Sequence, residues 1–184
     1  MSRFSYIPIP KLVLFCINEI DQRGATVNEL YSNNHETYVE FNEKIIQDFI
    51  RTKYLPDFSE ISDVKKICDL LKQFLKYLSE TLINSESFNK LEVIDSINDA
   101  TLFKNKLLEL PVVNKVTLAL LILHFKKIAY DKDYLITRND ISKIFAPIII
   151  GFNNEGEIND FTNIQISVSK NIIFLMDCLF LWIK

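Results

Sequence analysis

Apolar side chains recur every three or four residues along most of this 184-residue chain. This spacing places them on one side of an α-helix, and it is clearest between positions 64 and 78. Ser62 and Asp63 precede that stretch and are suited to cap the first turn of a helix. The stripe itself consists of Val64, Ile67, Leu71, Phe74, Leu75 and Leu78.

The same spacing predicts helices in most of the remaining chain, and no strand-like alternation persists anywhere. Gly24 should end the first helix, and Pro147 should end the seventh. Residues 113–130 should form the central buried helix, because residues 116–125 are apolar nearly all round. We therefore expect one all-α, multi-helix domain over residues 1–184. The expected helices cover residues 11–22, 38–49, 64–78, 86–94, 100–108, 113–130, 139–145 and 164–182.

Composition narrows the function classes. The formal net charge is −3 and no basic stripe is present, so we expect no nucleic-acid partner. The chain has three glycines, Gly24, Gly151 and Gly156, and none begins a glycine-rich phosphate or dinucleotide motif. A nucleotide-binding fold is therefore not expected, and we expect no cofactor.

The cysteines and histidines do not form a pattern of metal ligands. Cys16, Cys68 and Cys178 are far apart and lie within apolar helical patterns, which favours buried, reduced thiols. His35 and His124 have no partners at ligand spacing. His124 lies within an apolar run and should be a hydrogen-bonded core residue, so we expect no metal site.

The last apolar run, residues 172–183, spans twelve residues. A helix needs about 20 residues to cross a bilayer, so we expect a buried terminal helix and no transmembrane segment. We expect action in the cytoplasm. Secretion and delivery into another cell stay open, because an upstream signal could have been trimmed from the sequence.

Four segments in a consistent order resemble the RhoGAP domain, the helical domain that stimulates GTP hydrolysis by Rho, Rac and Cdc42. The likeness is greatest to the branch with the Rac GAP of the centralspindlin complex. It implies a Rho-family GTPase partner, Rac-like or Cdc42-like. The segments are IPKLVLFCINEIDQRG (9–24), ICDLLKQFLKYLSETLI (67–83), LPVVNKVTLALLILHF (110–125) and NDISKIFAPIII (139–150).

The loop Gly24 to His35, GATVNELYSNNH, departs from the family pattern. In the family this loop reads GLYRxSG, and its arginine is the catalytic finger. Alignment through Leu30 and Tyr31 puts Ser32 at the position of that arginine. Two glycines of the motif are also replaced, one of them by Glu29.

The chemistry of phosphoryl transfer makes this replacement important. An arginine finger is worth roughly 10³–10⁵ in rate, because its guanidinium offsets charge around the γ-phosphate. A serine hydroxyl is neutral and sits on a short stem. We therefore expect no catalytic residue and no enzymatic role, and we expect Ser32→Arg alone to restore little activity. Inactive duplicated copies, as among parasitoid-wasp venom RhoGAPs, are one candidate setting.

The resemblance also implies a set of GTPase-binding residues. Lys72 matches the signature lysine, and Lys76 stands where an arginine usually braces the finger loop. Taken on composition alone, two lysines four apart favour a solvated helix face. Asp140 replaces an asparagine that normally contacts the GTPase, although Asn139 is adjacent. The complete predicted set is Tyr31, Ser32, Lys72, Lys76, Asn139, Asp140 and Pro147.

Three interpretations follow. The first is an inactive RhoGAP-like domain that binds a Rho-family GTPase and sequesters or scaffolds its GTP-bound form. The second is a protein-interaction module that no longer binds GTPases, which the altered loop and Asp140 favour. The third is a weak GAP that uses a non-standard residue. Of the four arginines, Arg138 is best placed to serve, because it is close in sequence to Asp140.

Overall fold

The computed structural model describes residues 9–24, 30–31, 38–84, 105, 107–131, 134 and 136–150. Within this part of the chain there are helices and no strands, which confirms the all-α prediction. The elements are α1 (Lys11–Arg23), α2 (Val39–Thr52), the short 3₁₀ helix η2 (Phe58–Glu60), α3 (Val64–Lys76), α6 (Val112–Tyr130) and α7 (Arg138–Ile150).

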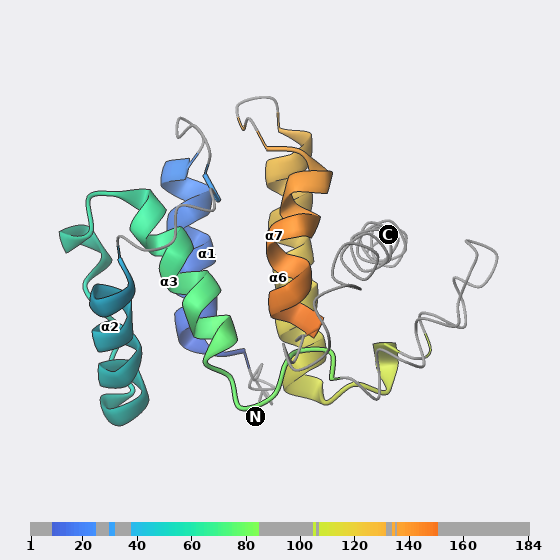
Figure 1. Cartoon of the computed structure of the whole chain (residues 1–184), viewed down its shortest axis with the longest axis horizontal. Coiled ribbons are helices and arrows are strands. Elements are labelled where there is room, and N and C mark those ends of the chain that lie inside the picture. Colours follow the sequence, from blue (N-terminus) through green and yellow to red (C-terminus); the bar gives the residue numbers. More distant parts are fainter. Residues whose placement is uncertain are drawn as a thin grey trace, which may run out of the picture.

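The helices form a bundle around α3 (Figure 1). α3 packs against α1, α2 and α7, and α6 packs against α1 and α7. α1 and α6 run in one direction, and α3 and α7 run in the other (Figure 1). The C-terminal ends of α1 and α6 and the N-terminal ends of α3 and α7 therefore lie toward one end of the bundle.

α3 forms as its sequence predicts. Its N-cap is Asp63, whose carboxylate accepts a hydrogen bond from the Lys65 backbone N–H at 2.9 Å. The predicted apolar stripe is buried, apart from Leu78, which follows the helix and is half-buried. Burial of this stripe against α1 and α7 makes α3 the centre of the fold.

α1 ends at Gly24, as predicted, but for a different local reason. Gly24 has a φ of −80°, a conformation open to every residue, so the position does not need glycine for a left-handed turn. A Cβ there would lie 3.0 Å from Leu30 Cδ1 and 3.4 Å from Tyr134 Cε1. Glycine leaves room for these side chains, and a larger residue would push the Leu30 side chain by a few tenths of an ångström.

The prediction that Pro147 ends a short helix is wrong. α7 continues from Arg138 to Ile150 with Pro147 inside it. Proline lacks an N–H and cannot donate to the carbonyl one turn earlier, which normally destabilises a helix. Here Ile148, Ile149 and Ile150 are all buried, and packing of this last turn keeps the chain helical through the proline.

The other two helices also differ in detail from the prediction. α6 was expected to be the central buried helix, but it is not buried on all sides, because Leu123 is 44% exposed while Leu121 and Ile122 are buried. On α2, Ile46 is buried and Phe41 is 43% exposed. Spacing predicted where these helices lie, but it did not predict which side of each helix the neighbours cover.

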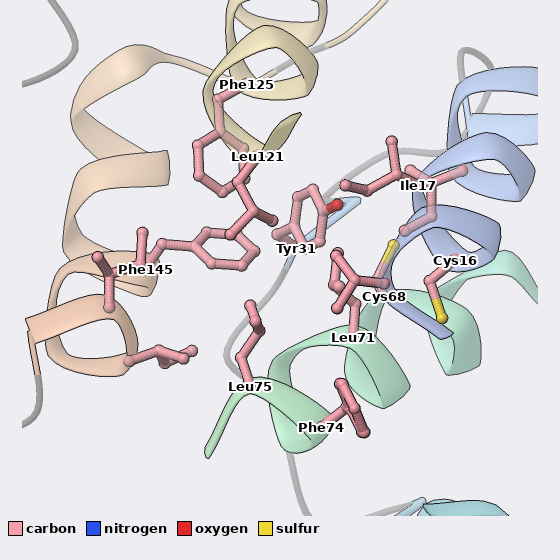
Figure 2. Packing of buried hydrophobic residues seen from close by; sticks show 14 of the residues in the cluster. Cys16, Ile17, Tyr31, Cys68, Leu71, Phe74, Leu75, Leu121, Phe125 and Phe145 are labelled. Atoms are coloured by element: carbon pink, nitrogen blue, oxygen red, sulfur yellow. The ribbon is translucent and has the colours of Figure 1, made fainter. Parts of the chain in front are cut away.

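The core gathers around Tyr31, a residue of the segment between α1 and α2 (Figure 2). Its ring lies between Leu121 and Phe145 on one side and Ile17 and Leu71 on the other (Figure 2). It packs edge-on against Phe145 with ring centroids 5.0 Å apart. A single loop residue therefore joins the α1–α3 half of the core to the α6–α7 half.

Two cysteines lie in the same core. Cys16 on α1 and Cys68 on α3 are free and buried, as the sequence predicted. Burial raises the pKa of both thiols well above the ordinary value. They are therefore apolar core residues and are kept protonated at neutral pH.

Several predictions fall outside the described residues. These are the helices over 86–94 and 164–182, most of the loop Gly24 to His35, and Cys178. Of the helix expected over 100–108, Asn105, Leu107 and Leu108 are described and are helical. Within the part of the chain that the structure describes, no helix is long and apolar enough to cross a membrane.

Candidate functional site

Tyr31, predicted to contact a partner, lies inside the bundle and is 1% exposed. Its hydroxyl is 2.7 Å from Nε2 of His124 on α6. Burial raises the pKa of Tyr31 well above the ordinary value, so the hydroxyl keeps its proton and can donate it. Tyr31 is therefore held in the core by His124, and its side chain does not reach the surface.

The hydrogen-bond chain continues from His124 to α1. His124 Nδ1 lies 2.5 Å from Oδ1 of Asp21, and Lys127 Nζ lies 3.1 Å from Oδ2 of the same carboxylate. Burial raises the pKa of Asp21, but the hydrogen bonds and positive charge of His124 and Lys127 outweigh it, so its pKa lies below the ordinary value. An ionised carboxylate only accepts hydrogen bonds. Nδ1 of His124 must therefore carry a proton, and Nε2 accepts from the Tyr31 hydroxyl if the ring is neutral or donates to it if the ring is protonated.

Lys72 is also inside the bundle, so the expectation of a solvated face is wrong for this residue. It is 2% exposed, and its Nζ lies 2.7 Å from Oδ1 of Asp69, one turn earlier on α3. Taking an ammonium group out of water is costly unless it is paired, and Asp69 supplies the opposite charge. Lys72 thus contributes to the scaffold of the site.

Lys76, the last residue of α3, is exposed. The chain just beyond it is joined to the end of α7, since Ile83 N–H donates to the Ile149 carbonyl at 3.0 Å. The Thr81 hydroxyl lies 2.9 Å from the Ile83 carbonyl and 3.1 Å from the Ile150 carbonyl, and its one proton can be donated to either.

Asp140 forms hydrogen bonds with Thr137 at the N-terminal end of α7. Thr137 N–H donates to Asp140 Oδ2 at 3.1 Å, and Asp140 N–H donates to Thr137 Oγ1 at 3.2 Å. This reciprocal pair is a capping box, which satisfies backbone donors at a helix start. The Asp140 carboxylate is exposed but is already engaged by Thr137. The Asp140 carboxylate therefore stabilises the start of the helix itself.

Two further groups stand at this end of α7. Asn139 is exposed. Arg138 is also exposed, and its guanidinium carbon lies 5.3 Å from the centre of the Tyr130 ring at the end of α6. This is within the range of a cation–π contact. The guanidinium is thus held near the same end of the bundle as Gly24, the start of the loop that departs from the family pattern.

The predicted site residues therefore divide into groups. Asn139 and Asp140 share the start of α7, whereas Pro147 is exposed eight residues later, about 12 Å along the helix axis. Lys76 lies at the opposite end of α3 from that helix start (Figure 1). Ser32 lies outside the described residues, so its pairing with the finger position stays a prediction.

Sequence reasoning missed Asp21 and Thr137. Asp21 gave no signal, since its partner His124 is 103 residues away in the chain. Thr137 did give one, because a threonine three residues before an acidic residue at a helix start is the sequence form of a capping box. That pattern could have placed the start of α7 at Arg138.

Comparison with known proteins identifies the family. Residues 10–154 match the RhoGAP domain. The chain belongs to the RhoGAP domain family. It is 33% identical over 177 residues to mouse (Mus musculus) Rac GTPase-activating protein 1, and it is 26% identical over 150 residues to mouse Rho GTPase-activating protein 27. These alignments cover 91% and 78% of the chain, but only 28% and 17% of the two relatives.

Solved RhoGAP structures share the fold. Human Rho GTPase activating protein 15 superposes with a TM-score of 0.74 over 94% of this chain and 84% of that one, at 20% identity. The BH domain from Graf, the GTPase regulator associated with focal adhesion kinase, gives a TM-score of 0.69 over 92% of each chain, also at 20% identity. The all-α fold expected from the resemblance is therefore confirmed.

These matches correct the expectation that the chain has no enzymatic role. The relatives are named as GTPase-activating proteins, and the family match covers most of this chain. The expectation depended on Ser32 alone. Because this residue lies outside the described part, nothing in the structure shows that a catalytic arginine has been lost.

Proposed function

We propose that this RhoGAP domain binds the GTP-bound form of a Rho-family small GTPase, with a Rac-like protein as the preferred partner. The observation that carries the proposal is the family match over residues 10–154, together with 33% identity to a protein named for Rac. The shared fold supports it, since the chain superposes on human Rho GTPase activating protein 15 with a TM-score of 0.74 over 94% of its length.

The proposed contact residues are those predicted from the sequence whose side chains are exposed in the structure. Lys76 offers a cation at the end of α3, and Asn139 offers an amide at the start of α7. Complementary charge at such a surface speeds association and selects partners more than it adds affinity. Pro147 and Asp140 complete the exposed set. Ser32, which lies outside the described residues, stays a predicted contact, whereas Tyr31 and Lys72 support the set from inside.

The test is calorimetry with Rac, Cdc42 and Rho, each loaded with a non-hydrolysable GTP analogue or with GDP. We expect binding in the micromolar range to the GTP-analogue form of Rac and weaker binding to the GDP form, where about 1 μM corresponds to −8.2 kcal/mol. Absence of binding to all three GTPases at about 100 μM would defeat the proposal in favour of an interaction module without GTPase affinity.

A second candidate function, GAP activity through a non-standard cation, is favoured by Arg138. Its guanidinium is exposed at the start of α7 and is next to Asn139. A cation near the γ-phosphate could offset the charge that develops during hydrolysis. If Arg138 serves this purpose, Arg138→Ala lowers the single-turnover rate at least tenfold, while Arg51→Ala, an exposed arginine paired with Asp48, leaves it unchanged.

A further inference from the structure

We propose that the buried chain Tyr31–His124–Asp21 is a positioning device, which holds the middle of the loop between α1 and α2 in place for partner binding. The proposal rests on the proposed function, since it concerns the same loop. The three residues come from the loop, from α6 and from α1, and they are joined by hydrogen bonds of 2.7 and 2.5 Å.

Because Tyr31 and His124 are buried, the Tyr31–His124–Asp21 hydrogen-bond chain favours a single position of Tyr31. The Tyr31 ring and the His124 side chain are almost entirely inside the bundle. A buried polar group that loses its partner is left without the water that would replace it, which is costly. If the loop withdrew Tyr31, Nε2 of His124 would lose its partner and the edge-on packing against Phe145 would be lost as well.

The hydrogen bonds run from Asp21 through His124 to Tyr31. Asp21 is ionised and is also paired with Lys127, so it accepts from Nδ1 and fixes the His124 tautomer. The remaining nitrogen, Nε2, is then hydrogen-bonded to the Tyr31 hydroxyl at 2.7 Å. Asp21 thus acts on the loop through His124, which is how a carboxylate commonly orients a functional imidazole.

Covalent geometry extends this effect to the neighbouring position. Consecutive Cα atoms are about 3.8 Å apart, so holding Tyr31 in place limits how far the next residue of the chain can move. Position 32 is the one that aligns with the family's finger. Tyr31, His124 and Asp21 are therefore positioning residues, and none of them is proposed to touch the GTPase.

Three variants separate the hydrogen bonds from the packing. Tyr31→Phe keeps the ring and removes only the hydroxyl. His124→Gln keeps a donor and an acceptor, whereas His124→Leu removes both. Ile128→Val is the matched control, because it makes a small cavity at a fully buried position one turn further along α6.

The first measurement is backbone hydrogen exchange of the peptide that contains Leu30 and Tyr31. We expect Tyr31→Phe and His124→Leu to raise its exchange rate at least tenfold, while α6 peptides change less. His124→Gln should lie closer to wild type than His124→Leu, and Ile128→Val should leave the peptide unchanged. Wild-type exchange of this peptide in Tyr31→Phe would overturn the proposal.

The second measurement is the affinity for GTP-analogue-loaded Rac, taken at a temperature where every variant is folded. We expect Tyr31→Phe to weaken binding about five- to tenfold and Ile128→Val to leave it unchanged, whereas a purely structural role would change neither. Failure of the wild-type protein to bind any GTPase overturns the proposed function and leaves the exchange experiment to decide the positioning role. Binding by wild type with equal affinity in Tyr31→Phe overturns the positioning role alone.

Discussion

The described residues of the predicted binding site lie in two regions with opposite properties. Tyr31 and Lys72 are inside the bundle, and each is paired with a buried or nearly buried polar group. Lys76, Asn139 and Asp140 are on the surface. Lys72 and Lys76 are only four residues apart on one helix, yet one is surrounded by protein and the other by solvent.

The difference shows that a residue can match a family motif without contacting the partner. A family signature marks residues that the site needs, but burial decides whether a residue touches the partner or holds the scaffold. Changes in the interior region should therefore act first on stability. Changes in the surface region should act first on partner binding.

The largest effect is expected at Lys72. Lys72→Ala leaves the Asp69 carboxylate buried without its cation, and breaking a buried pair in this way costs about 3–5 kcal/mol. Urea unfolding followed by circular dichroism measures the loss. Lys76→Ala on the same helix is the control, and equal midpoints for the two variants would show that the interior and surface lysines do not differ.

Removal of the Tyr31 hydroxyl should have the next largest effect. Tyr31→Phe leaves Nε2 of His124 without its buried partner, which costs about 1–3 kcal/mol of unfolding free energy. The same denaturant experiment measures it. A loss below about 0.5 kcal/mol would mean that water replaces the hydroxyl, which would weaken the distinction between a sealed interior and an exposed surface.

Acid should act on the interior region through Asp21. Its pKa in the folded chain is lowered from 3.8, so its contribution to stability is present above about pH 3.8 and is lost as pH falls through the lower folded value. We expect Asp21→Asn to be less stable than wild type at pH 7 and to lose less stability on acidification below pH 4. Parallel stability curves for the two proteins would contradict this assignment.

Thr137→Ala should lower the free energy of unfolding by about 1 kcal/mol, because it removes the side chain that caps the start of α7. Thr137→Ser keeps the hydroxyl and should stay near wild type. Thermal unfolding of the three proteins measures the difference. If alanine and serine behave alike, the Thr137–Asp140 pair does not stabilise the helix, and Asp140 becomes available to a partner.

The smallest effect is expected for Lys76. Lys76→Ala should weaken binding to GTP-analogue-loaded Rac a fewfold at low salt and less at high salt, since exposed charges are screened. Its urea midpoint should match wild type. Calorimetry at two ionic strengths measures both quantities, and a salt-independent change would show that Lys76 acts through packing.

Much of this fold could be predicted from periodicity. The stripe on α3, the cap at Asp63 and the buried His124 were all predicted from the sequence and are confirmed. Long-range pairing could not be predicted, since Asp21 and His124 meet only after the helices pack. The continuation of α7 through Pro147 was also missed, because local rules for proline do not include the burial of the turn that follows it.

The two buried thiols can report how often the core opens to solvent. Cys16 and Cys68 lie on facing helices, and both are held in the unreactive protonated form. An alkylating reagent can modify them only when α1 and α3 separate. The rate at which each sulfur is modified, followed by mass spectrometry of its peptide, therefore times the opening of the domain without an added label or an engineered probe.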